Sequence, residues 1–176
     1  MGQDFVWRQH FKSICNAPLE LVGQEELDES HPAIQFHKYW EILREQNEVP
    51  DDQDFVPEDV PAAMNWFMLF RREVKLGDDL YHLYRQGDSA AQMTHGHLDG
   101  LYLHEFTKQD CYTTRRELMR WILTEKRPGF ARIDIRNNKS EYFAEVTVGM
   151  FPMVSPNEAM VVVVPAPVSP KLRDII

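Results

Sequence analysis

An uninterrupted run of five apolar residues, Trp66 to Phe70, constrains the fold of this chain more than any other segment. A turn-forming cluster at residues 76–79 separates it from a second strand-like segment at 80–86, and this arrangement predicts a β-hairpin. A strand with one face in water alternates apolar and polar residues, which this run does not. We therefore expect both of its faces to be covered. One cover is the helical side of the domain, and the other is either a helix at residues 31–47 or a second protomer.

The segments around this hairpin predict helices before and after it, and three strands near the end of the chain. His31 and Pro32 favour a helix start, because proline in the first helical turn loses no backbone hydrogen bond. An α+β fold explains the order best, with an antiparallel sheet, helices packed on one face and an N-terminal helical extension. The elements that we expect are a helix at 31–47, a connector at 49–61, the hairpin, short helices between 88 and 106, a longer helix at 110–126, and strands at 131–136, 142–153 and 160–164.

The length of 176 residues fits one domain with a short appendage at each end. We expect a partly helical N-terminal leader at residues 1–30, a domain at 31–165 and a proline-rich C-terminal tail at 166–176. The formal net charge of −9 works against nucleic-acid binding, since a phosphate backbone is repelled unless a basic patch overrides the global charge. We therefore predict no nucleic-acid partner.

Cysteine usage and hydropathy indicate the compartment. Cys15 and Cys111 are far apart and belong to no CxxC motif, which is typical of a reducing compartment. No apolar run approaches the roughly 18 residues that span a bilayer, and residues 1–23 lack the apolar centre of a signal peptide. We expect a cytoplasmic protein with no membrane partner.

The chain contains a series of short motifs, namely Tyr39-Trp40, Val49-Pro50, Asp54 to Asp59, Tyr84 to Gly87, and Leu98-Asp99-Gly100. Their order and spacing resemble a bacterial family of PAS-like domains, over roughly residues 31–165. Two positions depart from the family pattern: Asp51-Asp52 stand where an arginine is usual, and Asp88 stands where a small hydroxyl residue is usual. These departures point to a ligand different from that of the family, or to none.

The resemblance implies a five-stranded antiparallel sheet with short helices that close a pocket against one face. PAS domains bind small molecules or cofactors in such a pocket, or dimerise and relay a signal, and members of this family often stand alone. Aromatic and methionine side chains there can enclose a flat or flexible apolar ligand, with a packed core as the alternative for each residue. The residues that the resemblance places in the pocket are Trp66, Met68, Phe70, Tyr84, Trp121 and Met150.

Three histidines, His95, His97 and His104, form the one metal-like pattern of the sequence, since imidazole is a ligand for zinc, copper or iron. The first two flank a glycine in an expected loop, where their rings need not converge. The alternative is surface histidines, and we predict no metal site. The sequence contains no nucleophile elbow, dinucleotide-binding fingerprint or P-loop. We therefore expect no catalytic residues and no enzyme activity, and the sequence identifies no cofactor.

These observations favour a sensory domain in signal transduction. We expect a small apolar or aromatic ligand in a pocket between sheet and helices, and an unidentified protein partner that receives the signal. The alternative is a ligand-free dimerisation or adaptor module that uses the same fold as an interaction surface, with a homodimer as one form of it.

Overall fold

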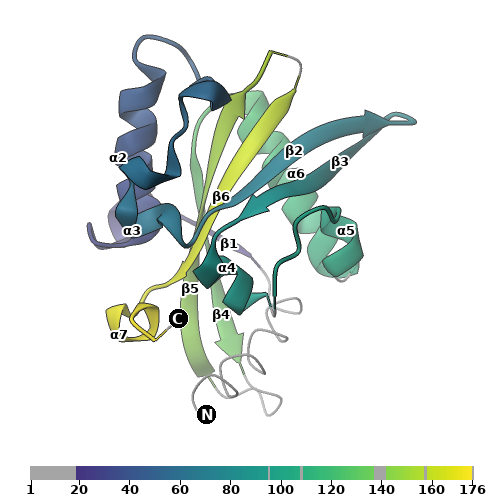
Figure 1. Ribbon diagram of the computed structural model, residues 1–176. Helices are drawn as coiled ribbons and strands as arrows, with labels where there is room; N and C mark the ends of the chain where they lie inside the picture. The colour runs from purple at the N-terminus through teal and green to yellow at the C-terminus, as the bar shows by residue number, and fades with distance from the viewer. Residues whose placement is uncertain (1–18, 95, 108, 137–141, 157, 176) are drawn as a thin grey trace.

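An antiparallel sheet of six strands forms the centre of the computed structural model, which describes residues 19–94, 96–107, 109–136, 142–156 and 158–175 (Figure 1). The strand order across the sheet is β1-β4-β5-β6-β2-β3. The strands are β1 (Glu20–Val22), β2 (Met68–Lys75), β3 (Asp78–Gln86), β4 (Gly129–Arg136), β5 (Tyr142–Val154) and β6 (Ala159–Pro167). The helices are α2 (Pro32–Arg44), α3 (Pro61–Met64), α4 (Asp88–Met93), α5 (Leu103–Phe106), α6 (Gln109–Glu125) and α7 (Pro170–Arg173), with 3-10 turns η1 (Gln24–Glu26), η2 (Asp52–Asp54) and η3 (Pro57–Asp59).

Strand β1 is the one strand of the described sheet that the sequence did not predict. Its three residues pair with β4, Leu21 lying opposite Ala131, and they fall within the segment 1–30 that we expected to be a partly helical leader. The α+β class and the antiparallel sheet are confirmed, whereas the predicted count of five strands is wrong by one. Residues 1–18, including Cys15, lie outside the described part of the chain.

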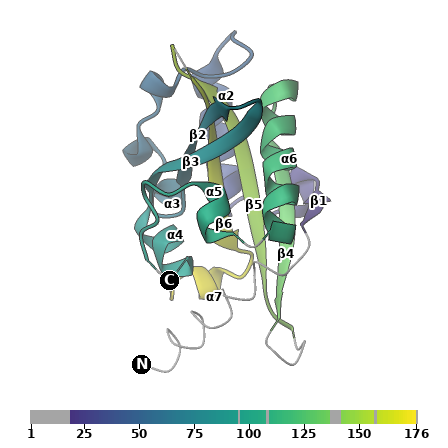
Figure 2. The same ribbon diagram turned by 90° about the vertical axis from the view of Figure 1, so that its right-hand side faces the viewer.

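The two longest helices lie on opposite faces of the sheet (Figure 2). On one face, Phe36 of α2 packs against Phe151 of β5, with ring centroids 4.8 Å apart. On the other face, Gly129 pairs with Met150, and a Cβ at Gly129 would meet Ile122 of α6. Successive strand residues point to opposite faces, so Phe151 and Met150 mark the two sides. Helices therefore cover both faces rather than one, because α2 occupies the face opposite α6.

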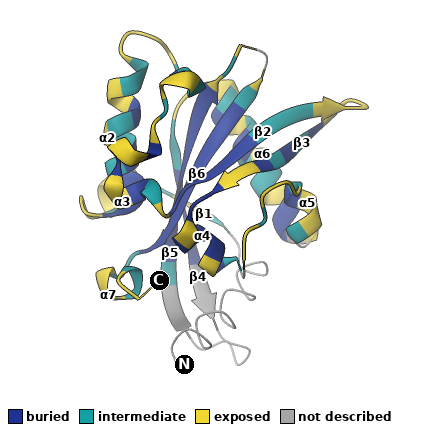
Figure 3. Ribbon diagram, in the orientation of Figure 1, coloured by how far each residue is buried: buried dark blue, intermediate teal, exposed yellow. Residues whose placement is uncertain are grey.

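This arrangement explains the apolar run in β2. Met68, Leu69 and Phe70 are all buried, and they pair with three valines of β6. Because their side chains alternate, Leu69 shares a face with Phe151 and α2, whereas its two neighbours share a face with Met150 and α6. Figure 3 shows the buried residues following β5, β6 and the first half of β2. Both covers of the strand belong to this chain, and no second protomer is needed to bury it.

The start of α2 is fixed by a buried histidine. His31 caps the helix: its Nδ1 accepts from the backbone N–H of Ala33 at 3.1 Å, and its Nε2 lies 3.1 Å from the carbonyl of Ala166 in β6. Because Nδ1 accepts, the proton is on Nε2, which donates to that carbonyl. Burial lowers the pKa of His31 to about 4, so the ring is neutral near pH 7.

The C-terminal end of the chain is part of the fold. β6 continues to Pro167, beyond the predicted strand end at 164 and into the segment 166–176 that we expected to be a tail. Its pairing with β2 ends at Val163, so the two prolines at its end, Pro165 and Pro167, lie where only β5 is a neighbour. Within the described parts of the chain, no helix combines the length and the apolarity that a membrane crossing requires.

Candidate functional site

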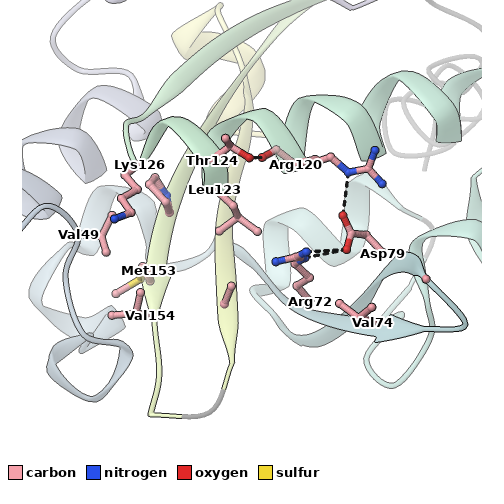
Figure 4. A pocket seen from close by; sticks show the side chains of 13 residues that line it. Val49, Arg72, Val74, Asp79, Arg120, Leu123, Thr124, Lys126, Met153 and Val154 are labelled. Atoms are coloured by element: carbon pink, nitrogen blue, oxygen red, sulfur yellow. Dashed lines mark hydrogen bonds and ion pairs between the residues drawn. The ribbon is translucent and has the colours of Figure 1, made fainter.

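A cavity of about 640 Å³ lies between the C-terminal half of α6, the β2–β3 hairpin and the adjoining ends of β5 and β6 (Figure 4). It opens where the hairpin extends past the last residue of β2 that pairs with β6, Arg71. Charged and apolar side chains both line it, with Arg72, Asp79 and Arg120 gathered in one cluster. Its lining consists of Val49, Arg72, Val74, Gly77, Asp79, Arg120, Leu123, Thr124, Lys126, Pro152, Met153, Val154 and Ala159.

The charged cluster of the cavity is organised by one carboxylate. Asp79 of β3 is buried, and its Oδ1 accepts from Nε and Nη2 of Arg72 at 2.9 and 2.8 Å. Its Oδ2 accepts from Nε of Arg120 on α6 at 2.8 Å. Burial alone would raise the pKa of the Asp79 carboxyl, but the hydrogen bonds from Arg120 and Arg72 lower the pKa below its usual value. Asp79 is therefore ionised at neutral pH and joins the hairpin to α6.

The two arginines retain donors beyond those used on Asp79. Each guanidinium carries five N–H groups. Arg72 places two nitrogens on Asp79, and Arg120 uses its Nε on Asp79 and its Nη1 on Glu117 at 3.2 Å. Their side chains are 37 and 42% exposed, so an incoming anion can reach them. Lys126 adds a third cation to the lining, paired at 2.6 Å with Glu48, which is not part of that lining.

A buried tyrosine lies two residues along β3 from Asp79. Tyr81 is wholly buried, and its hydroxyl has no hydrogen-bond partner among the described residues. Burial, and then the charge of Asp79, raise the pKa of Tyr81 to about 12, so the phenol is neutral. A buried hydroxyl without a partner is uncommon and costs folding free energy. Near the cluster of Asp79 and its two arginines, the Tyr81 hydroxyl is therefore a hydrogen-bond donor and acceptor that no described residue uses.

The six residues that the resemblance placed in a pocket have two different surroundings. Trp66, Met68, Phe70 and Met150 are buried in the core, each at most 6% exposed. Tyr84 and Trp121 are 49 and 37% exposed, and each lies beneath an arginine: Arg71 is 3.5 Å from the Tyr84 ring centroid, and Arg127 is 5.1 Å from that of Trp121. Among the described residues that line the cavity, none of the six is found. Their role as ligand contacts stays a prediction.

The histidines of the metal-like pattern lie in separate surroundings. His97 lies 3.4 Å from a carboxylate oxygen of Asp88 and 3.2 Å from one of Asp99. His104 packs beside two tyrosine rings, Tyr102 and Tyr112. His95 falls outside the described residues. Over the ranges that are described, no group of three or more His, Cys, Asp or Glu side chains is arranged to hold a metal ion.

The sequence analysis did not identify Arg72, Asp79 and Arg120 as site residues. It assigned Asp79 to a turn and predicted no role for Arg120, whereas in the structure the buried carboxylate of Asp79 accepts from the partly exposed guanidinium of Arg120. The signal that was present is the spacing of Arg72 and Val74 in the mostly charged second half of β2, which places a charged and an apolar side chain on the same face. Comparison of the chain with family models, curated proteins and solved structures gave no match, so the PAS resemblance remains a hypothesis.

Proposed function

We propose that this chain is a PAS-like sensory domain that binds a small amphipathic anion in the α6–hairpin cavity and acts through a protein partner. The observation that carries the proposal is the cavity itself, whose lining combines three cationic side chains and one carboxylate with apolar side chains such as Leu123, Met153 and Val154. Pockets for small molecules combine apolar walls with a few polar groups that fix orientation. A ligand with a carboxylate head and an apolar tail can contact both the cationic and the apolar side chains of this lining.

The fold supports this proposal without identifying a family. Strands β2 to β6 form a five-stranded antiparallel sheet, which agrees in strand number with the sheet that the resemblance implies, and β1 is an addition at one edge. Helices α5 and α6 pack on the face of Met150, as expected for the helical side of a sensor. The cavity lies beside α6 at the end of that face rather than at its centre, where buried side chains fill the space.

The ion pair at the cavity suggests how occupancy is transmitted. Asp79 belongs to the hairpin and Arg120 to α6, and their contact is one of the links between the two elements. An anion that recruits Arg120 weakens its hold on Asp79, since both compete for the same guanidinium. Ligand binding then changes how firmly the hairpin is held against the helix, and a partner protein can detect this change.

The proposal is tested with octanoate as the probe and 1-octanol as its uncharged counterpart. Isothermal titration of the full chain is expected to show saturable octanoate binding and at least tenfold weaker binding of octanol, because only the carboxylate reaches the arginines (about tenfold is 1.4 kcal/mol). Arg120→Gln and Lys126→Gln are expected to weaken octanoate binding, and Lys38→Gln, on the outer side of α2, is the charge-matched control. Equal binding of the two probes, or no binding by native mass spectrometry, contradicts the proposal.

The second candidate is a ligand-free interaction module. The observation that favours it is the tip of the hairpin, where Leu76 is fully exposed and Val74 is 62% exposed. Exposed apolar side chains at a projecting turn are typical of protein contacts when they are contiguous. Light scattering over a concentration series tests the dimer form of this candidate, which predicts a mass that doubles as concentration rises. A monomer at all concentrations removes that form.

A further inference from the structure

The outer half of β2 presents a free strand edge. β2 pairs with β6 only from Met68 to Arg71, and among the described residues no strand lies beside residues 72–75 on the side away from β3. Figure 1 shows the β2–β3 hairpin leaving the sheet at this point and extending away from β6. The space beside the edge is a second cavity of about 440 Å³, lined by Arg72 to Lys75 and by Glu158 and Ala159.

The register of the hairpin shows which backbone groups face this space. Lys75 pairs with Asp78 across a two-residue turn, in which Leu76 and Gly77 both have positive φ. The closing pair of such a hairpin is hydrogen-bonded, and hydrogen-bonded and non-hydrogen-bonded pairs alternate along an antiparallel ladder. Lys75 and Glu73 therefore direct their backbone groups to β3. Arg72 and Val74 direct theirs outward, into the notch beside β2.

The side chains at the same positions define what can lie there. Arg72 and Val74 share one face of β2, and both also line the larger cavity beside α6. A strand paired with this edge would place the residues opposite Arg72 and Val74 on the face of β2 that borders the cavity, whose lining also includes Arg120 and the exposed side chain of Val154. An acidic side chain fits the position opposite Arg72, and an apolar side chain fits the position opposite Val74.

A second copy of the chain fits this edge poorly. An antiparallel self-pairing that uses the outward groups of both Arg72 and Val74 sets each Arg72 opposite the Val74 of the other copy. Glu73 then lies opposite its own copy, and Lys75 lies opposite Arg71. Like charges directly opposite each other destabilise a strand pair. These like-charge pairs disfavour self-association. Glu158, which lines the notch, is already paired with Arg71. On the cavity face Arg72 and Arg120 share the single carboxylate of Asp79, and this excess of positive charge favours an acidic residue of a partner strand.

We propose that residues 72–75 of β2 are a docking edge for an extended segment of a partner protein that carries an acidic and an apolar residue two positions apart. The segment adds to the hairpin as an antiparallel strand. Its backbone bonds to Arg72 and Val74, and its side chains on one face enter the cavity beside α6. This inference does not require the small anion, because the edge and its hydrogen-bonding groups are present in the empty protein; an anion in the cavity would compete with the side chains of the segment.

The probe is the peptide acetyl-Thr-Glu-Ile-Thr-Glu-amide, whose isoleucine and final glutamate lie opposite Val74 and Arg72 in the antiparallel register. Its control is the same peptide methylated on the backbone nitrogens of those two residues, which keeps the side chains and blocks strand pairing. Titration of the isotope-labelled full chain, followed by amide NMR, is expected to shift the signals of residues 72–75 saturably with the first peptide only.

Two protein variants separate the backbone from the side chain. Val74→Pro removes an outward N–H at an edge, where proline is tolerated, and is expected to weaken binding about tenfold or more. Val74→Ile keeps both the N–H and an apolar, β-branched side chain, and its binding is expected to stay within about twofold of the wild type. The inference is overturned if both peptides bind equally, if Val74→Pro binds like the wild type, or if no shift occurs up to about 1 mM peptide. A concentration-dependent dimer with shifts at the same amides would instead assign the edge to a second copy. The octanoate experiment can fail or succeed independently of this one, because it measures the heat of octanoate binding and not the amide signals of residues 72–75.

Discussion

The indole N–H of Trp40, on α2, donates a hydrogen bond of 2.8 Å to the backbone carbonyl of Pro152, in β5. The two residues are separated by 112 positions in the sequence, and the indole is 2% exposed. The bond joins the N-terminal helix to the end of β5 that lines the cavity. Helix position and cavity shape are thereby coupled through one buried donor.

Trp40→Phe is expected to lower the free energy of unfolding by about 2–3 kcal/mol, because it removes ring volume and leaves the Pro152 carbonyl without its donor. Urea denaturation followed by circular dichroism measures the change. Ile42→Ala on the same helix is the control, since Ile42 is 73% exposed, and it should change stability by no more than about 0.5 kcal/mol. Equal effects of the two substitutions would show that α2 is held by its apolar stripe alone.

Gly87→Ala is expected to destabilise the protein by at least about 2 kcal/mol, because an added Cβ would lie 2.6 Å from both the carbonyl carbon and the oxygen of Asn65. Those neighbours are backbone atoms and cannot rotate away. Gly23→Ala is the matched control: its Cβ would meet only the exposed and flexible side chain of Glu25. Thermal unfolding of the two variants should differ clearly, and similar melting temperatures would count against the close approach at Gly87.

Stability should fall as the pH drops from about 6.5 toward 4, partly through His31. The pKa of His31 is about 4 in the folded chain against 6.5 for an unperturbed histidine, so the unfolded state binds the proton more readily in that window. The contribution of neutral His31 to the free energy of unfolding is complete above pH 6.5. It is lost as the pH falls toward 4, a change of about 3 kcal/mol.

His31→Asn tests this assignment, since asparagine caps helices well and does not titrate. Burial also lowers the pKa of His37, which adds a slope of the same sign, so the quantity to measure is the difference between wild type and variant across the pH range. The variant should show a flatter pH profile between 4 and 6.5. An unchanged slope would mean that His31 is not the titrating group.

Asp79→Asn is expected to lower the free energy of unfolding by about 1–3 kcal/mol, because a neutral amide at this buried position no longer offers a charged acceptor to the partly exposed guanidinium groups of Arg72 and Arg120. Asp78→Asn, the adjacent exposed residue, is the control. The variant should also lose stability less steeply below pH 4 than the wild type. Because the pKa of Asp79 is lower in the folded than in the unfolded chain, its ionisation stabilises the fold at pH values above the unfolded pKa, and this stabilisation disappears as the pH falls. Chemical denaturation at pH 7 and pH 3 gives both comparisons.

The sequence predicted the elements that have a strong local pattern. The helix start at His31 and Pro32 predicted α2, and the turn between two strand-like segments predicted the hairpin, because both follow from the pattern of a single segment. β1 could not be predicted in this way, since Glu20–Val22 contains only three residues and is a strand because β4 has an open edge beside it.

The candidate site was unpredictable for a related reason. Arg72, Asp79 and Arg120 come from three elements, and only tertiary packing brings the carboxylate of Asp79 into contact with both arginines. Tyr84 illustrates the converse. It was expected beside Met68 and Phe70, but a β-bulge between Leu69 and Phe70 leaves it without a cross-strand partner, and its ring lies beneath Arg71.

The position of β6 determines the order in which the sheet can be completed. β2 and β3 form one hairpin, β4 and β5 form another, and β6 is the strand that pairs with both. During synthesis the first hairpin must therefore wait, with the apolar residues of β2 uncovered on one edge, until residues 159–167 leave the ribosome. A chain shortened before Ala159 would hold two unconnected hairpins and aggregate, and the high sequence separation of the β2–β6 contacts should make refolding of the intact chain slow.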